Sequence, residues 1–459
     1  MYRDVVIIGA GPAGLFAAYE LTNNSKLSVL IIDQGPDVDE RVCPAKEYAF
    51  CRKCVPCNIL CGVGGAGTLS GGLLNLRPDI GGNLIELVGS QNKAWKLIRY
   101  VDSIFLKYGA PQKLYSSKGS DVEELERRAA AAGAKFIPIP QRHIGSDQAP
   151  RVIKNFKRDL ESHGVKFLLR KKVEKIDPGM VTLEDGNVIH AKYIIAAPGR
   201  VGANWLAKEA QRLGIPTRHE PIDIGVRIEV PAVVMEPIIK VSRDPKFHIY
   251  TKTYDDLVRT FCVNHKGFVV QEVYDDFVGV NGHSMVGSYS ENTNFAFLVR
   301  ISLTEPIEDT TAYGRSIARL ATILGGGKPI IQRLGDLMIG RRSTWNRISH
   351  SHIKPTLRSA TPGDIAMVLP HRILTDILEG LEVLNQIIPG VASSSTLLYA
   401  PEVKFSANRI QTNDELETPI KNIYVAGDGA GLSRGIVIAA ATGIIVAKSI
   451  LKKEGLLKE

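Results

Sequence analysis

A glycine-rich turn near the N-terminus constrains the fold of this chain more than any other feature. An apolar, β-branched run at residues 5–8 leads into Gly9-Ala-Gly-Pro-Ala-Gly14, and a helical segment follows at 15–22. A second apolar run begins at Leu27 and ends at Asp33. A GxGxxG turn that follows a strand, opens a helix and precedes a strand with a terminal acid is typical of a dinucleotide-binding βαβ unit.

The residues of this turn have separate roles in nucleotide binding. Gly9 permits the tight turn, Gly11 lets the backbone approach a pyrophosphate, and Gly14 lets helix and strand pack closely. The helix N-terminus supplies free N–H groups and the positive end of a dipole for phosphate. We expect Asp33 to accept hydrogen bonds from ribose hydroxyls. The candidate nucleotide contacts in this unit are Gly9, Gly11, Pro12, Ala13, Gly14, Asp33 and Gln34.

Composition places the chain among globular proteins of two or three domains, since 459 residues contain 44% hydrophobic and 23% charged side chains. The sequence contains no uninterrupted run of about 18 apolar residues, which is the length that a membrane-spanning helix needs. The first strand begins almost at Met1, with no signal-peptide pattern, so we expect a cytoplasmic protein. The net charge of +9 is compatible with an anionic substrate, an acidic redox partner or RNA.

The far end of the chain points to FAD. Ile423-Tyr-Val-Ala-Gly-Asp428 reads as an apolar strand that leads to an acid, and glycines and a helix follow; this resembles the second FAD motif of flavoproteins with two dinucleotide-binding domains. A predicted β-meander ends in Ala197-Pro-Gly199, which resembles their third, ATG-like motif. This resemblance implies that Asp428 holds a ribityl hydroxyl and that Val173 meets the adenine with its backbone. The contacts that it adds are Val173, Ala197, Pro198, Gly199, Gly427, Asp428, Gly435 and Ile436.

A loop of small residues at 62–72 resembles the Gly/Ser loop of fumarate-reductase-like and thiazole-synthase-like flavoproteins, which passes the pyrophosphate and the isoalloxazine ring. The contacts that it implies are Gly65, Ala66, Gly67, Thr68, Ser70, Gly71 and Gly72. Because neither this loop nor 427–436 contains His or Cys, we expect FAD to bind non-covalently.

Together these motifs predict an α/β fold in which a discontinuous, Rossmann-like FAD domain carries an inserted α+β substrate domain. The predicted FAD-binding parts are 1–80, 150–215 and 395–459, with the meander in the second. Residues 81–149 are expected to be a mostly helical insertion or connection, and 216–394 the substrate domain. No second GxGxxG follows a strand in the middle of the chain, so we expect no nicotinamide domain.

Five of the six cysteines lie between positions 43 and 61. Cys51, Cys54 and Cys57 have the x-x spacing of iron–sulfur ligands, and Cys43 and Cys61 compete as the fourth thiolate. The spacing favours a 4Fe–4S cluster, with structural zinc or thiol–disulfide chemistry as alternatives.

The chain resembles a family of FAD-dependent dehydrogenases of bacteria and archaea over nearly its whole length. Besides the cysteine and glycine segments, the similarity rests on 223–227, 280–284, 293–295, 404–405 and 427–436. The resemblance implies that Cys43, Cys51, Cys54 and Cys57 are the metal ligands. The chain departs from the family pattern in reading Ser70-Gly-Gly-Leu-Leu74 where Asp and Lys are usual, and in lacking a second cysteine after Cys262.

The leading hypothesis is therefore an FAD-dependent oxidoreductase of a small molecule, whose cluster receives electrons from ferredoxin or a similar carrier. A prenyl-lipid reductase and an RNA-binding, tRNA-modifying flavoprotein are the alternatives. His283 and Tyr289 are conceivable proton donors, but the sequence assigns no catalytic residue. A basic segment could bind a carboxylate or phosphate, or form a solvated face; it contains Arg341, Arg342, Arg347, His350, His352, Lys354 and Arg358.

Overall fold

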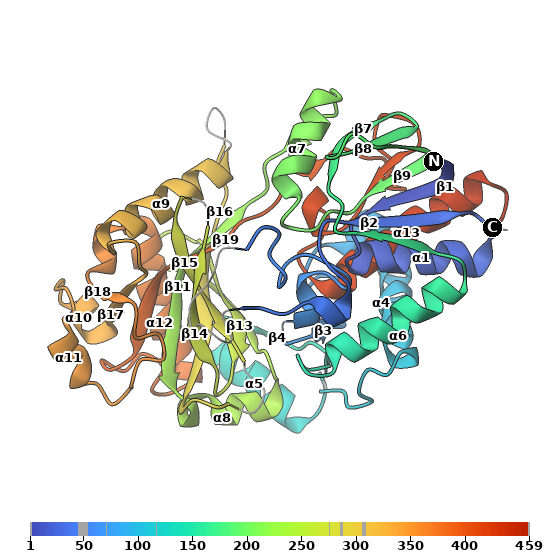
Figure 1. Cartoon of the computed structure of the whole chain (residues 1–459). Coiled ribbons are helices and arrows are strands. Elements are labelled where there is room, and N and C mark those ends of the chain that lie inside the picture. The colour runs from blue at the N-terminus through green and yellow to red at the C-terminus, as the bar shows by residue number, and fades with distance from the viewer. Residues whose placement is uncertain are drawn as a thin grey trace. The chain divides into compact units, whose positions relative to one another are not determined.

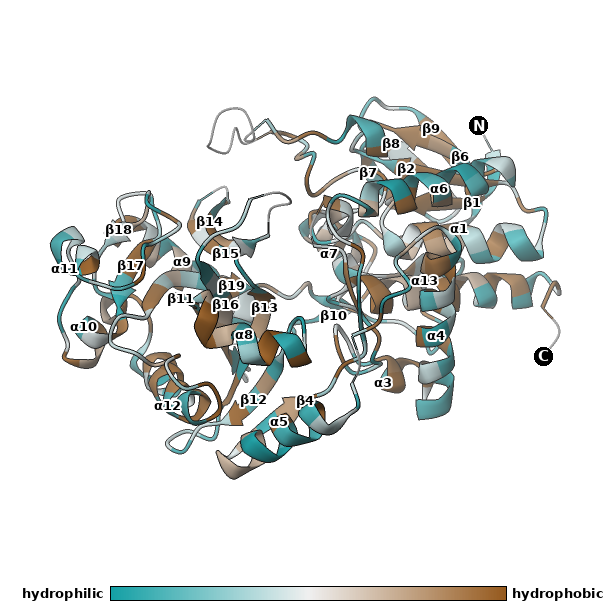
Figure 2. Ribbon diagram, turned by 90° about the horizontal axis from the view of Figure 1, so that it is seen from below, coloured by the Kyte–Doolittle hydropathy of each residue, from teal (hydrophilic) through white to brown (hydrophobic). Residues whose placement is uncertain are grey.

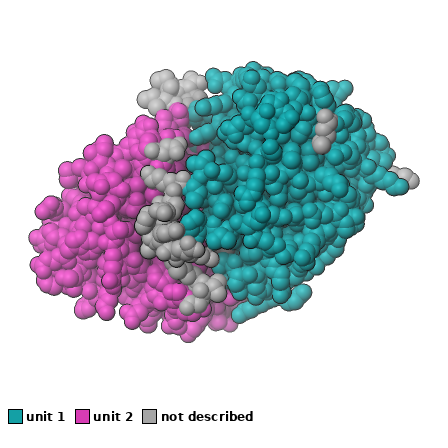
Figure 3. All heavy atoms as spheres, viewed as in Figure 1, with its two compact units in different colours: residues 1–114, 142–220, 407–459 teal, residues 115–141, 221–406 magenta. Residues whose placement is uncertain are grey.

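The computed structural model (Figure 1) describes residues 2–44, 54–69, 71–115, 117–274, 276–284, 288–304 and 309–457. The chain folds into two compact units, which Figure 3 distinguishes by colour. Unit 1 consists of residues 1–114, 142–220 and 407–459, and unit 2 of 115–141 and 221–406. Each unit is therefore assembled from segments that are far apart in the sequence, which agrees with the predicted discontinuous α/β fold.

The main sheet of unit 1 has the strand order β6-β2-β1-β9-β8-β7, and β21 also pairs with β9. Its strands are β1 (Tyr2–Ile8), β2 (Val29–Asp33), β6 (Lys166–Leu169), β7 (Val173–Asp177), β8 (Met180–Leu183), β9 (Val188–Ala196) and β21 (Ile423–Val425). The first four strands of the order are parallel, as is β21, whereas β7 and β8 form an antiparallel meander with β9. Residues 5–8 of β1 are buried, so the parallel part is a central layer.

Six helices of unit 1 lie within its described residues. They are α1 (Pro12–Asn24), α3 (Leu84–Val88), α4 (Gln91–Lys107), α6 (Ala149–Ser162), α7 (Ala203–Arg212) and α13 (Ile436–Lys453), with short 3₁₀ turns η1 (Val38–Glu40), η2 (Ala66–Leu69) and η4 (Asp428–Ala430). Helix α1 packs on α13, where a Cβ on Gly443 would lie 2.0 Å from the Ala13 carbonyl oxygen. Short strand pairs complete the unit: β3 (Leu73–Asn75) with β5 (Gln141–His143), and β10 (Thr217–Arg218) with β20 (Arg409–Ile410).

Unit 2 is built on a largely antiparallel sheet with the order β18-β17-β19-β11-β16-β13-β12-β4. The strands are β4 (Ala134–Ile137), β11 (Ile222–Pro231), β12 (Lys246–Tyr250), β13 (Leu257–Asn264), β16 (Asn292–Ile301), β17 (Ile330–Arg333), β18 (Thr361–Pro362) and β19 (Leu397–Lys404). A separate hairpin pairs β14 (Phe268–Val273) with β15 (Val278–His283). Strand β4 comes from residues 115–141, so this stretch extends the sheet of unit 2.

The helices of unit 2 are α5 (Ser120–Ala131), α8 (Ala232–Val241), α9 (Thr310–Leu324), α10 (Leu334–Met338), α11 (Trp345–Ser349) and α12 (His371–Ile387), with one 3₁₀ turn, η3 (Ile365–Met367). Helix α5 buries Val122, Leu125 and Ala129, while its charged residues appear as the hydrophilic colour in Figure 2. The buried residues recur every three or four positions, which is the spacing of an amphipathic surface helix. Within the described part of the chain, no helix is both long and apolar enough to cross a membrane.

Candidate functional site

Three parallel strands of unit 1 end in register. Ile8 of β1 is paired with Ala196 of β9, and Ala196 is paired with Val425 of β21. The segments that follow these strands, 9–14, 197–199 and 426–436, therefore leave the sheet at the same edge. The carboxyl edge of a parallel sheet is where such folds bind ligands, so the motifs predicted from sequence are brought together there.

Close backbone packing holds the first turn. Gly9 has a φ of +108°, and a Cβ there would lie 2.1 Å from the carbonyl oxygen of Ala197. A Cβ on Gly14 would lie 2.0 Å from the carbonyl oxygen of Gly9. Both positions consequently require glycine for the fold itself, before any ligand is considered.

Gly11 is different, because no protein atom crowds it. Its φ is −78°, and the nearest atom to a Cβ at this position would be the Cα of Gly65, at 3.9 Å. Gly11 precedes α1, whose first turn contains no acidic residue and receives no side-chain cap from the described residues. The helix N-terminus therefore has free N–H groups that suit a phosphate.

The loop 62–72 borders the same turn. The Gly64 N–H donates to the Ala10 carbonyl oxygen over 2.8 Å, and a Cβ on Gly67 would come within 2.8 Å of the Ile436 Cδ1. Pro12, Gly64, Gly67, Thr68, Gly72 and Ile436 are among the residues that line one pocket. The loop 62–72 thus contacts both the turn 9–14 and the start of α13. Ser70, another expected contact, lies outside the described residues.

Thr68 supports the fit of a ligand to this loop. Its side chain is 2% exposed, and its hydroxyl has no hydrogen-bond partner among the described residues. A Cβ on Gly64 would lie 2.0 Å from this oxygen. A buried polar atom is usually satisfied. The orphaned hydroxyl and the space kept by glycine therefore fit a cofactor that presents hydrogen-bonding atoms here.

Asp33 organises the site through three backbone amides. Its Oδ2 accepts from Ala10 N over 2.8 Å, and its Oδ1 accepts from Gly35 N at 2.7 Å and Gly62 N at 2.9 Å. The carboxylate thus holds together the glycine turn 9–14, the end of β2 and the start of the loop 62–72. A carboxylate has about four lone-pair sites, so it retains capacity for the expected ribose contact. Gln34, beside it, donates from Nε2 to the Cys61 sulfur over 3.4 Å.

The C-terminal motif carries a paired carboxylate. Asp428 accepts from Arg200 Nε over 2.9 Å and from the Ser433 hydroxyl over 2.5 Å. Gly435, which precedes α13, has extended backbone and no side-chain cap from the described residues. A Cβ on Gly429 would lie 2.5 Å from the Gly199 carbonyl oxygen, so 197–199 and 427–436 are packed together. Val173 is buried on β7, opposite Leu183.

The described part of the cysteine segment is attached to the glycine loop by Arg41. This residue is 4% exposed, and its guanidinium donates to the carbonyl oxygens of Asn58, Ile59, Val63 and Gly65 over 2.7–2.9 Å. Arg41 belongs to none of the motifs that the sequence shows. Its only signal is a basic residue close to the first cysteine. This contact supports the expectation that the cysteine segment lies beside the cofactor loop.

The four expected metal ligands are only partly described. Cys43, Cys54 and Cys57 are partly exposed free thiols, whereas Cys51 lies outside the described residues. Among the residues that are described, no group of three or more His, Cys, Asp or Glu side chains gathers around a point. Cys61 is buried, and burial, reinforced by the charges of Asp33 and Cys57, raises the pKa of its thiol to about 11. Metal binding therefore stays a prediction.

Strand β11 of unit 2 alternates between apolar and polar residues that are all buried. Ile222, Ile224, Val226, Ile228 and Val230 are inaccessible on one face. The other face carries Asp223, Arg227 and Glu229, each no more than 1% exposed. Successive side chains of a strand point to opposite faces. We call the second face the polar face of β11; burial of its charges is sustained only because each one is paired.

Arg227 is the centre of this polar face. Its guanidinium donates to both oxygens of Glu402 over 2.9 and 3.0 Å, to the Asn294 Oδ1 over 2.8 Å and to the Cys262 carbonyl over 2.7 Å. Burial alone would lower the pKa of Arg227, but the Glu402 carboxylate outweighs it and raises that pKa. The family-like stretches 223–227, 280–284 and 293–295 converge here.

Gly282 is expected to be indispensable to this network. A Cβ there would lie 2.0 Å from the Arg227 Nη2 and 2.2 Å from the Asn264 Nδ2. We expect Gly282→Ala to lower the free energy of unfolding by about 1–3 kcal/mol, because overpacking displaces buried partners. Gly279→Ala on the same strand is the control, since its Cβ would be 3.4 Å from the nearest atom. Equal urea midpoints for the two variants would refute this interpretation.

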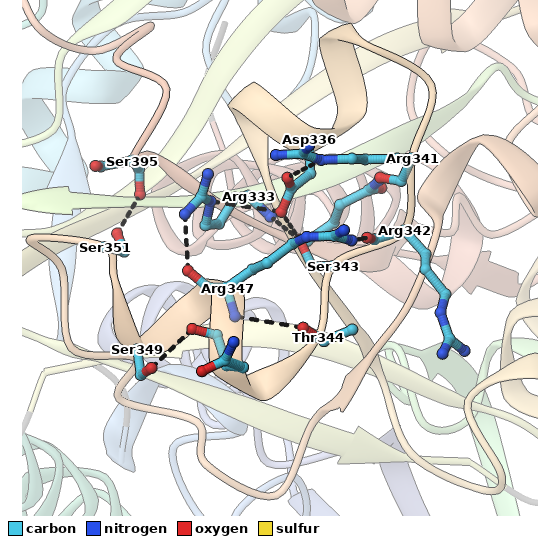
Figure 4. A network of polar contacts seen from close by, with 12 residues as sticks. Arg333, Asp336, Arg341, Arg342, Ser343, Thr344, Arg347, Ser349, Ser351 and Ser395 are labelled. Carbon is cyan, nitrogen blue, oxygen red and sulfur yellow. Dashed lines mark hydrogen bonds and ion pairs between the residues drawn. The ribbon is translucent and has the colours of Figure 1, made fainter.

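Much of the basic segment serves internal structure rather than a ligand (Figure 4). Arg341 Nε donates to the fully buried Asp336 over 2.7 Å, and the Ser343 hydroxyl donates to the same carboxylate over 2.7 Å. Arg347 donates to the Arg342 carbonyl and accepts from Arg333 through its own carbonyl. Arg341 and Arg347 therefore make contacts within the protein, and neither of the two interpretations of the segment, an anion site or a solvated face, describes them.

Asp336 is expected to make the stability of the fold depend on pH. Burial alone would raise its pKa, but the Ser343 hydroxyl and the guanidinium of Arg341 lower it. The ionised carboxylate therefore stabilises the fold above the unfolded-state pKa of about 3.9, and this contribution is lost as pH falls through the lower folded-state value. We expect Asp336→Ala to lose about 3–5 kcal/mol at pH 7 and the difference from wild type to shrink below about pH 4. Urea unfolding at a series of pH values measures it; a constant difference would contradict the assignment.

The two conceivable proton donors are placed differently. His283 is half-buried at the end of β15. Tyr289 is 74% exposed, which is unlike a residue held in a closed site. Neither position assigns a catalytic role.

Comparisons with known proteins agree with the geometry. Residues 221–405 match a family model described as the FAD-dependent protein, C-terminal domain-like, and residues 7–38 match the NAD(P)-binding Rossmann-like domain. Both matches agree with an FAD-dependent oxidoreductase. An uncharacterized protein of Clostridium beijerinckii is 28% identical over 485 aligned positions, which cover 99% of this chain and 81% of the relative.

Solved structures similar to this chain include L-proline dehydrogenase from P. horikoshii, with 12% identity, coverage of 98% and 94% of the two chains and a TM-score of 0.43. Glycine oxidase from Geobacillus kaustophilus has 15% identity, coverage of 98% and 95% and a TM-score of 0.37. TM-scores of this size identify neither a reaction nor a substrate.

Proposed function

We propose that unit 1 holds FAD non-covalently at the carboxyl edge of its parallel strands. The observation that carries this is the meeting of the turn 9–14, the loop 62–72 and the segments 197–199 and 427–436 at one edge, with the orphaned Thr68 hydroxyl beside them. In this proposal the N-terminus of α1 receives the pyrophosphate, and Asp33 and Asp428 receive the ribose and ribityl hydroxyls. When bound, FAD supplies hydride and electron transfer.

The residues around that edge are proposed to bind and orient the cofactor. Asp33 orients the turn and the loop together through its three amide contacts. Arg200 and Ser433 hold the carboxylate of Asp428 in one direction, so that its remaining lone pairs face a fixed position. Gly11 keeps the approach to the helix N-terminus open.

We further propose that Cys43, Cys51, Cys54 and Cys57 hold a 4Fe–4S cluster that passes electrons between a carrier such as ferredoxin and the flavin, for redox chemistry on a small molecule. The x-x spacing of three cysteines supports it. The attachment of 58–65 to Arg41, next to the cofactor loop, also supports it. Zinc would suit the same thiolates but carries no electrons. The described residues contain no specific feature that favours a prenyl lipid or RNA.

Anaerobic purification tests this function directly. We would record the absorption spectrum and assay FAD, iron, acid-labile sulfide and zinc per chain. Flavin bands that leave the protein on acid precipitation, together with iron and sulfide in equal amounts, are the expected result. A colourless protein would refute the FAD site, and yellow protein with zinc or no metal would refute only the cluster.

A further inference from the structure

A second pocket lies in unit 2, where the loop between α11 and β18 passes one end of the polar face of β11. It has a volume of about 270 Å³. Its lining includes Phe268, Glu291, Asn292, Lys354, Thr356 and Arg358. Two of these residues, Lys354 and Arg358, belong to the basic segment noted in the sequence, and neither contacts Asp336.

Within the described part of the chain, Lys354 and Arg358 are cations without a protein counterion. Both are exposed at the pocket, and among the described residues neither forms an ion pair. Arg341, in the same basic segment, is by contrast neutralised by Asp336. Glu291 contributes the one carboxylate of the described lining. The formal charge of the lining is therefore positive, because Lys354 and Arg358 outnumber it. Two cations of this kind at a concave surface attract an anion.

The buried Glu229 holds the loop 350–360, which carries both cations, through hydrogen bonds. The Thr356 hydroxyl donates to Glu229 Oε1 over 2.6 Å, and the Tyr399 hydroxyl donates to its Oε2 over 2.6 Å. The Asn292 Nδ2 donates both to Glu229 Oε1 at 3.0 Å and to the Lys354 carbonyl at 2.8 Å. The loop backbone is therefore attached to the sheet at Lys354 and at Thr356.

The Thr356 hydroxyl also accepts from the Val269 N–H of β14, over 2.9 Å. The loop is thus tied to β11, β16 and β14 within unit 2. Fixing the backbone beforehand reduces the entropy that a ligand would otherwise have to offset on binding. This is how a binding site differs from a merely solvated basic face.

We propose that this pocket binds a small organic anion, with a carboxylate or phosphate group between Lys354 and Arg358 and its remainder against the Phe268 ring. The Glu291 carboxylate at the lining would accept a hydrogen bond from a hydroxyl or amino group of the same ligand. Carboxylate and phosphate share the required chemistry, since both accept charge-assisted hydrogen bonds from Lys and Arg. The inference is independent of the cofactor site and of the cysteine segment.

The test is calorimetric titration of the protein, purified with its cofactor, against two probes at low ionic strength: inorganic phosphate and citrate. We expect the double variant Lys354→Ala/Arg358→Ala to raise the Kd of the bound probe at least tenfold. Preference for phosphate indicates a phosphate-bearing ligand, and preference for citrate a carboxylate-bearing one. FAD content and thermal midpoint report whether the variant remains folded.

The control removes charge from the same segment but outside the pocket. Figure 4 shows the Arg342 side chain pointing away from the Asp336 network, and Arg342 does not line the pocket. Each single variant, Lys354→Ala and Arg358→Ala, is compared with Arg342→Ala, which removes the same charge and should change the Kd less than twofold. The proposal is overturned if Arg342→Ala weakens binding as much as either single variant, if the double variant binds like wild type, or if neither probe binds at up to about 10 mM.

Discussion

Gly11→Ala is expected to deprive the protein of FAD while leaving the apoprotein folded. The added Cβ would meet nothing closer than the Gly65 Cα at 3.9 Å, and the φ of −78° is open to alanine. The methyl group would instead occupy the approach to the N-terminus of α1, where we propose the pyrophosphate to lie. We expect a loss of about 3 kcal/mol, equivalent to roughly a hundredfold rise in the Kd for FAD. Flavin fluorescence during titration of the apoprotein measures it.

Two further variants separate a ligand effect from a folding effect. Gly9→Ala would place its Cβ 2.1 Å from the Ala197 carbonyl oxygen, so we expect it to lower the stability of the apoprotein as well. Gly279→Ala, in unit 2, should leave both FAD affinity and stability unchanged. An unaltered Kd for Gly11→Ala would show that the pyrophosphate does not lie at this helix terminus.

The parallel core of unit 1 could be predicted because its pattern is local. Residues 5–33 contain a complete strand, turn, helix and strand, and the structure forms β1, α1 and β2 there. The three amide contacts of Asp33 were not predictable in the same way. One of them comes from Gly62, and that pairing depends on how a segment of unrelated sequence returns to the turn.

The polar face of β11 could be recognised as half of an alternating strand but not as buried. A strand that reads Ile-Asp-Ile-Gly-Val-Arg-Ile-Glu-Val ordinarily presents its polar residues to water. Here every charge has a partner from another segment, such as Glu402 for Arg227 and Tyr399 for Glu229. Sequence patterning shows which residues share a face, whereas the partners that allow their burial are set by long-range topology.

The basic segment illustrates the same limit at a candidate site. Residues 341–358 suggest an anion site by their density of positive charge alone. The sequence does not show which of these cations are paired within the protein and which are available to a ligand. Asp336, only five residues before Arg341, was the available signal that part of the charge is neutralised. Lys354 and Arg358 are distinguished from the rest only by the pocket and by the loop contacts to Glu229.

Cys54→Ser is expected to remove iron and the input of electrons while leaving FAD bound. Cys54 belongs to the x-x series that would cover one face of a cluster, and serine is a poor ligand for the soft metal site. The proposed FAD contacts lie in other segments, so flavin content should remain near one per chain. We expect the rate of flavin reduction by reduced ferredoxin to fall by about tenfold or more, since removal of a single-electron relay leaves no other route for the carrier. Anaerobic stopped-flow absorbance measures that rate.

Three matched serine variants make this result specific. Cys262→Ser in unit 2 is far along the chain from the cysteine segment and should retain iron and the wild-type rate. Cys61→Ser distinguishes the competing fourth ligands, because we expect it to keep its iron while Cys43→Ser loses it. If Cys54→Ser were reduced as fast as wild type, electrons would enter the flavin without a cluster. If instead Cys61→Ser lost iron and Cys43→Ser kept it, the cluster would stand with Cys61 as its fourth ligand, next to Asp33 and the loop that Arg41 holds.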